Sequence, residues 1–284
     1  MKLIDDNLNR IIEKEALAES VTKMLIHHPF IAQSAKPGQF VIVVPQPESE
    51  RIPLTLAGVD RENGSVTVIF QEVGTTTKKL GALKTGDKVT HLVGPLGKPV
   101  EIEKYGRVIL ITGGVGSAFV YWMAQAFAEK GNQVWAIMGA RTANLIILEK
   151  EISSICEKLF ITTDDGSKGV KGFVTDVLKQ ILASGEKFDL ALCAGPVPMM
   201  KKVAEITRDA SIKTIASLNP LMVDGTGMCG GCRVTVGGKV KFACVEGPDF
   251  DAHQVDFDEL MKRVNFYRKH EECSLDRYLK SLKS

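Results

Sequence analysis

Hydrophobic residues in the first hundred positions form short runs separated by turn residues, a pattern typical of β-strands. The runs are FVIVV (40–44), LTLAGV (54–59), GSVTVIF (64–70) and KVTHLVGPLG (88–97). The stretch GTTTKKLGALKTGD (74–87) instead predicts a short helix followed by a Gly-Asp turn. Short strands at such spacing predict an antiparallel β-barrel or sandwich over residues 1–102.

The pattern changes near residue 105, where longer and almost continuous apolar runs begin. Four such runs end in glycine or polar residues and alternate with helical patterns: RVILITGG (107–114), QVWAIMGAR (133–141), LFITTDDGS (159–167) and FDLALCAGP (188–196). Strands that are apolar on both faces and alternate with helices are typical of a parallel sheet covered on both sides. Residues 103–216 are therefore predicted to form an α/β doubly wound parallel-sheet domain.

The last part of the chain has two further zones. Residues 217–250 hold a loop rich in glycine and cysteine, then RVTVGGKVKFAC, in which Gly237-Gly238 is a hairpin turn signal. Residues 251–284 are charged and predicted to be helical. We therefore expect a small C-terminal subdomain followed by a helical tail.

Composition narrows the class of protein only modestly. The 284 residues carry 36 basic and 34 acidic side chains, so the net charge of +2 favours neither nucleic acid nor an anionic membrane as a partner. Charged residues interrupt the N-terminal stretch, and no apolar run reaches the length of a membrane span. We expect a cytoplasmic protein, in which cysteines serve as core residues, redox groups or metal ligands rather than in disulfides.

The stretch VDGTGMCGGC (223–232) carries the most specific chemistry in the chain. Asp224, Cys229, Cys232 and Cys244 follow the pattern D-x4-C-x2-C-x11-C. This is the plant-type spacing for a [2Fe–2S] cluster with aspartate in the first position. The glycines of the loop permit positive φ angles and allow backbone N–H groups to approach cluster sulfides. The pattern predicts a [2Fe–2S] site with these four residues as ligands.

Two other interpretations of the loop remain: a zinc site, or a metal-free loop with incidental thiols. Structural zinc usually takes two closely spaced ligand pairs, whereas here one pair is followed by a lone cysteine. Asp224 either ligates iron or is only a hydrogen-bonding neighbour, in which case another group completes the site. Cys156 and Cys193 lie in apolar surroundings and are expected to be small core residues.

Glycines end the first strand of the predicted parallel sheet. Gly113, Gly114 and Gly116 let the backbone approach a pyrophosphate, and the following helix N-terminus supplies N–H donors. A plain tight βα turn is the alternative. Its position at the first βα junction favours a dinucleotide site, because ligands bind outside the carboxyl ends of such strands.

Other strand ends are expected to line the same edge of the sheet. Gly139 and Arg141 close the second strand, while Gly195 and Pro196 close the fourth. Arg141 is either a phosphate or ribose contact or a solvated surface side chain. Asp165, beside Asp164, mildly favours NAD over NADP, although aspartates here also suit a turn.

The first domain offers a second anion cradle. Arg51 begins RIPLT, and one strand later Gly74 to Thr77 place hydroxyls and free amides at a helix start. Such amides bind anions, and a simple threonine N-cap is the alternative.

These motifs together resemble the ferredoxin–NADP reductase superfamily, in which a β-barrel binds FAD and an α/β domain binds the nicotinamide cofactor. RIPLT is similar to its flavin-contacting segment, GTTTKKL to its FAD-pyrophosphate turn with Thr76 in place of a glycine, GGVG to its nicotinamide-phosphate loop, and AGPVPMM to its Gly-Pro element. The cofactor-binding positions implied are Arg51, Pro53, Leu54, Thr55, Phe70, Gln71, Gly74, Thr75, Thr76, Thr77, Gly113, Gly114, Val115, Gly116, Gly139, Arg141, Asp165, Gly195 and Pro196.

The cysteine loop narrows the resemblance. Electron-transfer subunits of dihydroorotate dehydrogenases share the domain order but normally carry four cysteines. The aspartate is closer to the small subunits of NADH-dependent reduced ferredoxin:NADP oxidoreductases, also called sulfide dehydrogenase β subunits. This resemblance implies FAD, a [2Fe–2S] cluster and NAD(H) as cofactors.

It also implies a heterodimer with a larger flavin and [4Fe–4S] subunit, which bifurcates electrons from NADPH to NAD and, through the partner, to ferredoxin. Hydride transfer to a flavin needs no protein acid or base, so no catalytic side chain is predicted. The alternatives are an electron-transfer subunit of an NAD-dependent dihydroorotate dehydrogenase and a zinc-stabilised binding module.

Overall fold

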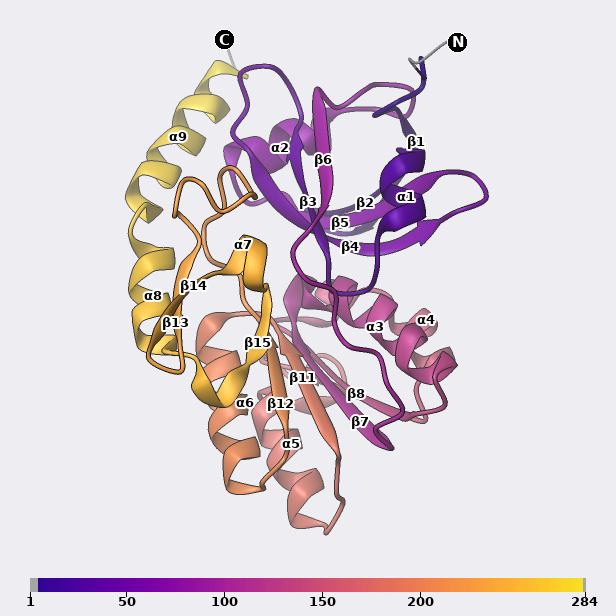
Figure 1. Ribbon diagram of the computed structural model, residues 1–284, viewed down its shortest axis with the longest axis vertical. Helices are drawn as coiled ribbons and strands as arrows, with labels where there is room; N and C mark the ends of the chain where they lie inside the picture. The colour runs from indigo at the N-terminus through magenta and orange to yellow at the C-terminus, as the bar shows by residue number, and fades with distance from the viewer. Residues whose placement is uncertain (1–4, 283–284) are drawn as a thin grey trace.

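The computed structural model describes residues 5–282 and shows two large sheets, one above the other in Figure 1, with the C-terminal helices along one side. The upper sheet comes from the N-terminal part of the chain and the lower sheet from the middle. Within residues 5–282 no helix combines the length and the apolar character that crossing a bilayer requires.

The upper sheet has six antiparallel strands in the order β1-β2-β5-β4-β3-β6. Its strands and helices are β1 (Ile11–Ala18), β2 (Val21–His27), α1 (Pro29–Ser34), β3 (Phe40–Val44), β4 (Ile52–Asp60), β5 (Ser65–Gln71), α2 (Thr75–Ala82) and β6 (His91–Leu96). The predicted antiparallel architecture and the helix after Gly74 are confirmed. Beyond the ladders, an isolated bridge joins Arg10 to Lys88, ahead of β1 and β6.

Alternate residues of these strands form the core of the upper sheet. Val66, Val68 and Phe70 of β5 are buried together with Val41 and Val43 of β3. Because side chains alternate across a strand, this arrangement presents one apolar face inward. Phe70 therefore serves the core, and it does not line either of the large cavities described below.

The lower sheet is parallel except at one edge, in the order β10-β9-β8-β7-β11-β12-β15. Its elements are β7 (Arg107–Gly113), α3 (Ser117–Glu129), β8 (Gln133–Ala140), α4 (Glu149–Ile155), β9 (Lys158–Thr163), β10 (Val170–Lys171), α5 (Val174–Ala183), β11 (Leu190–Ala194), α6 (Val197–Asp209), β12 (Thr214–Ser217) and the antiparallel β15 (Asp249–Asp251). Single 3-10 turns follow β7 (Gly114–Gly116), β8 (Ala143–Leu145) and β15 (Ala252–Gln254). The doubly wound sheet is confirmed, with three strands more than the four predicted.

Helices cover both faces of the lower sheet, as its continuous apolar strands require. Val108 and Leu110 of β7 pack in one cluster with residues of α3 and α4. Ile109 and Ile111, which alternate with them, pack in another cluster with residues of α5 and α6. The chain order reverses between β7 and β11, so a crevice opens there at the carboxyl ends of the strands.

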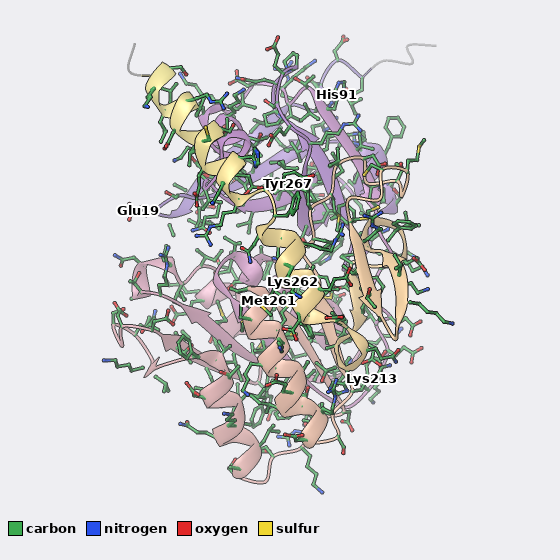
Figure 2. The ribbon with its side chains drawn as sticks, turned by 90° about the vertical axis from the view of Figure 1, so that its left-hand side faces the viewer. Glu19, His91, Lys213, Met261, Lys262 and Tyr267 are labelled. Atoms are coloured by element: carbon green, nitrogen blue, oxygen red, sulfur yellow. The ribbon has the colours of Figure 1, made fainter. Side chains whose placement is uncertain are left out.

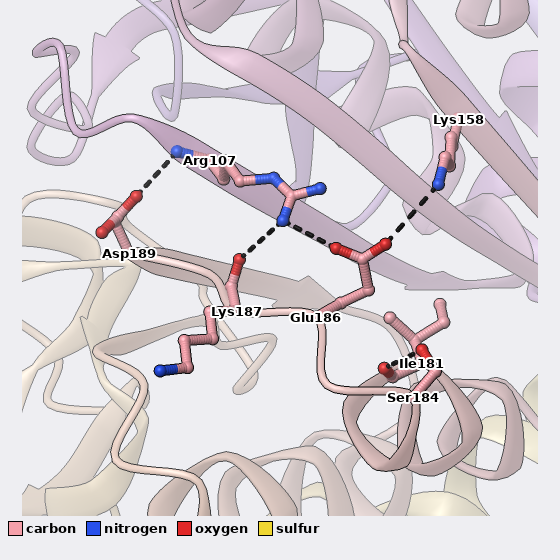
Figure 3. Close-up of polar contacts among 7 residues, drawn as sticks. All are labelled: Arg107, Lys158, Ile181, Ser184, Glu186, Lys187 and Asp189. Carbon is pink, nitrogen blue, oxygen red and sulfur yellow. Dashed lines mark hydrogen bonds and ion pairs between the residues drawn. The ribbon is translucent and has the colours of Figure 1, made fainter.

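The opposite end of the lower sheet is held by a cluster of charges around Trp135, which is 1% exposed. The Cζ atom of Arg107 lies 4.8 Å and the Nζ atom of Lys158 lies 4.0 Å from the centre of the indole ring. Glu186 joins both cations, at 2.7 Å from Arg107 and 3.7 Å from Lys158 (Figure 3). The hydrogen bond from Arg107 lowers the pKa of Glu186. This cluster lies away from the carboxyl ends of the strands and is structural.

The C-terminal part of the chain leaves the lower sheet at one edge, after β12, and returns to the same edge at β15. Strands β12 and β15 are neighbours, and between them the chain forms a loop, the hairpin of β13 (Arg233–Val236) and β14 (Lys239–Phe242), and α7 (Ala243–Glu246). Gly237 and Gly238 have φ angles of 59° and 71°, as a type I′ turn needs, which confirms the predicted hairpin. Helices α8 (Phe257–Asn265) and α9 (Arg268–Ser281) then run upward beside both sheets (Figure 1).

Candidate functional site

The predicted ligands of the cysteine loop comprise a buried pair of cysteines, one exposed cysteine and the half-buried Asp224. The Sγ atoms of Cys232 and Cys244 lie 3.1 Å apart, and these residues are 1% and 2% exposed. Cys229 is exposed on the glycine-rich loop. The Asp224 carboxylate accepts the N–H groups of Thr226 at 2.8 Å and Cys229 at 2.6 Å. These backbone donors, Thr226 first, lower the pKa of Asp224.

The loop has donor chemistry suited to a thiolate-bound cluster. Within residues 5–282 no three His, Cys, Asp or Glu side chains converge as they stand. Backbone N–H groups do point at the sulfurs, from Gly231 to Cys229 at 3.4 Å and from Cys244 to Cys232 at 3.5 Å. Such hydrogen bonds tune iron–sulfur centres. Burial raises the pKa of the Cys244 thiol to about 12, so a bound cation would have to supply the charge that ionises it.

Glycines seat this loop against the upper sheet. Gly225, Gly227 and Gly230 have φ angles of 77°, 87° and 67°, which L side chains rarely adopt. A Cβ atom on Gly225 would approach the side chain of Leu96 in β6 to 2.7 Å. The glycine content therefore lets the loop turn back and pack closely on the sheet predicted to bind flavin.

A cavity of about 1360 Å³ joins that sheet to the cysteine loop. Its wall brings together Arg51, the first turn of α2 and the segment Cys229–Gly231, which are far apart in the sequence. In addition to Arg51, four predicted cofactor-binding positions line this cavity: Gly74, Thr75, Thr76 and Thr77. Pro53, Leu54 and Thr55 follow in β4 and do not line it.

The first turn of α2 provides the anion cradle predicted from the sequence. The Thr77 hydroxyl accepts the N–H of Gly74 at 2.9 Å and donates to its carbonyl oxygen at 3.0 Å, which fixes the start of the helix. Gly74 has no side chain with which to cap the amides that follow. Those amides and the positive end of the helix suit the pyrophosphate of a dinucleotide. The residues present thus fit FAD.

A second cavity, of about 520 Å³, lies at the carboxyl ends of β7, β8 and β11. It contains the predicted nucleotide positions Gly113, Gly114, Val115, Gly139, Arg141 and Pro196. Gln71, at the end of β5 in the upper sheet, lines it as well. These six of the residues predicted to hold NAD(H) are therefore gathered in one cleft between the two sheets.

Gly116 and Gly195 do not line this cleft but let its two glycine loops touch. A Cβ atom on Gly116 would overlap the carbonyl oxygen of Ala194. A Cβ atom on Gly195 would lie 3.0 Å from the backbone nitrogen of Gly113. Because these two glycines have no side chain, the two loops can approach each other closely, and this approach shapes the cleft.

Asp165 does not line the cleft. Its carboxylate accepts the Ser167 N–H at 2.9 Å and the Ser167 hydroxyl at 2.6 Å, as a turn-forming aspartate does. Asp164, its neighbour, lines the cleft together with Lys202 of α6, a residue that sequence patterns did not single out. Cys156 and Cys193 are buried as expected, and Cys273 is exposed on α9.

Two family models match the chain. The iron–sulfur cluster binding domain of dihydroorotate dehydrogenase B matches residues 219–256, and the oxidoreductase NAD-binding domain matches residues 110–205. These are the segments that carry the cysteine loop and the second cavity.

Full-length similarities extend over both sheets. A Thermotoga maritima protein named dihydroorotate dehydrogenase B (NAD(+)), electron transfer subunit homolog, is 46% identical over 96% of each chain. The electron transfer subunit of Geobacillus thermodenitrificans is 32% identical over 86% of this chain and 96% of its own. A solved structure of the NADH-dependent reduced ferredoxin-NADP oxidoreductase, studied for flavin-based electron bifurcation, shares 45% identity and a TM-score of 0.91 over 98% of this chain and 100% of its own.

Fold and site together define an electron-transfer oxidoreductase with a ferredoxin-reductase-like fold, an NAD-binding domain and a C-terminal iron–sulfur domain. Its cofactors are FAD, a [2Fe–2S] cluster and NAD(H). The chain belongs to the family of dihydroorotate dehydrogenase B electron-transfer subunits and their homologues.

Proposed function

We propose that this chain is the NAD(H)-side subunit of an electron-bifurcating NADH-dependent reduced ferredoxin:NADP oxidoreductase. In this proposal it pairs with a larger flavin and [4Fe–4S] subunit, through which ferredoxin is reached. Support comes from the solved structure of that enzyme, because one of its chains matches this chain over its whole length at 45% identity. The dihydroorotate dehydrogenase subunit of Geobacillus thermodenitrificans matches at 32% over 86% of this chain, whereas the Thermotoga maritima protein, named as a homolog of such a subunit, matches at 46% over 96%.

One observation carries the proposed electron path: the larger cavity has the candidate flavin residues on one wall and the cysteine loop on another. Arg51 and the first turn of α2 would hold FAD, while Cys229 lies on the same cavity. When bound, a flavin exchanges two electrons with nicotinamide and single electrons with an iron–sulfur centre.

The side chains that line the two cavities have binding and positioning roles in this proposal. The amides of α2 and the guanidinium of Arg51 would bind the flavin, and the backbone around Gly113 and Gly114 would bind the nicotinamide dinucleotide. Cys229, Cys232 and Cys244 would hold the iron, with Asp224 as the fourth ligand. Gln71, at the end of β5, lines the nicotinamide cleft, so in this proposal it would orient the flavin ring against the nicotinamide ring.

The test is cofactor analysis of the complex purified anaerobically from its native host. We expect about one FAD and about two iron and two sulfide per copy of this chain, and reduction of its flavin by NADH. Iron-free, colourless material would contradict the cofactor assignment. Reduction of the complex by dihydroorotate, with no [4Fe–4S] signal from the partner, would favour the dihydroorotate dehydrogenase alternative.

A further inference from the structure

Helix α9 lies against the rest of the molecule without burying any residue of its own. It runs beside α2, where the Thr75 and Ser274 hydroxyls lie 3.2 Å apart and the Nζ atom of Lys79 lies 5.9 Å from the centre of the Tyr278 ring. An isolated polar helix of this length is marginal in water. Burial of an apolar face therefore does not account for the position of α9.

The segment that joins α8 to α9 forms a wall of the larger cavity. Phe266, Tyr267, Arg268 and His270 line this cavity, on which the first turn of α2 also lies. Tyr267 lies at the junction of the two helices, above Lys262 (Figure 2). Phe266 and Tyr267 are 72% and 47% exposed, with ring centres 4.9 Å apart. Large aromatic side chains left exposed beside a cavity indicate a ligand surface.

The side chains on this wall match an adenine nucleotide. Aromatic faces stack on purine bases, and imidazole and guanidinium groups suit the neighbouring phosphates. The rings of Tyr267 and His270 lie 6.3 Å apart at 67°. They belong to one helical turn, so a single planar ligand can contact both.

The position of α9 indicates which half of a flavin dinucleotide it meets. The phosphates belong at the first turn of α2, and the isoalloxazine must reach the nicotinamide cleft on the Gln71 side of the upper sheet. Ser274 meets that same first turn at Thr75, from the side of α9. The adenosine half is thereby left to the α8–α9 wall.

We infer that Tyr267 and His270 contact the adenosine half of FAD and make the site select FAD over FMN. This inference rests on the proposed function, because it assumes that the larger cavity holds the flavin. By linkage, FAD then stabilises α9 as much as α9 strengthens FAD binding.

The experiment uses the full chain, stripped of flavin with its cluster retained, and follows flavin fluorescence during titration with FAD and with FMN. For the double variant Tyr267→Ala/His270→Ala we expect the FAD Kd to rise by about tenfold or more and the FMN Kd to stay within about twofold. Tyr278→Ala is the matched control, since Tyr278 lies on the same helix outside the cavity, and we expect it to bind both flavins as the wild type does.

Hydrogen exchange gives an independent readout, because FAD should slow amide exchange in α9 and FMN should not. An unchanged FAD Kd in the double variant, an equal loss of FMN, or an equal loss in Tyr278→Ala would each overturn the inference. A wild-type chain that binds neither flavin would instead contradict the proposed function, so the two failures are distinguishable.

Discussion

The sulfur atoms of Cys232 and Cys244 lie 3.1 Å apart inside the protein, although the two residues come from opposite ends of a hairpin. Cys232 precedes β13, Cys244 follows β14, and the Gly237-Gly238 turn brings them together. Two of the proposed cluster ligands are therefore held by a pair of strands, and the third, Cys229, is exposed on the neighbouring loop.

Replacement of a buried cysteine should weaken iron binding. In Cys244→Ser we expect iron affinity to fall by more than about tenfold, since a hydroxyl replaces a thiolate. Iron, acid-labile sulfide and visible absorbance of the purified protein measure this loss. Cys273→Ser is the control, because that exposed thiol lies on α9; equal iron loss in both variants would contradict the assignment.

Replacement of Asp224 tests whether this aspartate is the first ligand of the cluster. If its carboxylate binds iron, Asp224→Cys should retain a cluster whose midpoint potential shifts on the order of 100 mV, because ligand type sets the potential. Redox titration followed by EPR measures the change. An identical potential and EPR spectrum would mean that Asp224 only accepts the Thr226 and Cys229 amides seen here.

The glycine loops of the smaller cavity should be sensitive to a single methyl group. Gly116→Ala would drive a Cβ atom into the Ala194 carbonyl and separate the two loops, so we expect the NADH Kd to rise about tenfold. Gly58→Ala, in β4, meets nothing within 4 Å and serves as the control. Equal NADH affinity in Gly116→Ala and wild type would show that the loops need not touch.

Asp249 should make stability depend on pH. Its carboxylate is buried, and this burial raises its pKa from 3.8 to about 7, with Ser217 opposing only part of the rise. The folded protein therefore holds this proton more tightly than the unfolded chain. Stability is lost as pH rises from about 4 to about 7, by roughly 4 kcal/mol at most.

Asp249→Asn removes the titrating group and should flatten this dependence. Urea unfolding at pH 5 and pH 8 would show a smaller difference in the free energy of unfolding for the variant than for the wild type. A variant whose pH slope equals that of the wild type would show that other groups cause it.

Sequence patterns predicted the elements whose burial or chemistry is visible in neighbouring residues. The parallel strands are buried on both faces and the cysteine spacing is chemically specific, so both were recognised. Strands β2 and β1 were missed; β2 buries four of its seven residues, but in β1 only Ile11 is buried, and charged residues at Glu13, Lys14 and Glu15 disguise the alternation. A strand exposed on most positions carries little apolar signal.

Residues that reach a cavity from a distant element were also missed. Tyr267 and Lys202 lie in helices whose sequence pattern concerns only their own packing, and nothing local marks them as cavity residues. At the other extreme, Phe70 and Asp165 stand at positions suggested by resemblance, yet one packs in the core and the other closes a turn. The final direction of a side chain depends on tertiary contacts that neighbouring letters do not encode.

The adjacency of β12 and β15 has an evolutionary consequence. An insertion whose two ends sit one strand spacing apart demands no rearrangement of its host, which is why domain insertions succeed at such places. The segment between β12 and β15, which carries the cysteine loop, thus has the geometry of an insertion that can be transferred as a unit. Related reductases can gain or lose the iron–sulfur segment at this edge and keep the hydride chemistry of their flavin and nicotinamide sites.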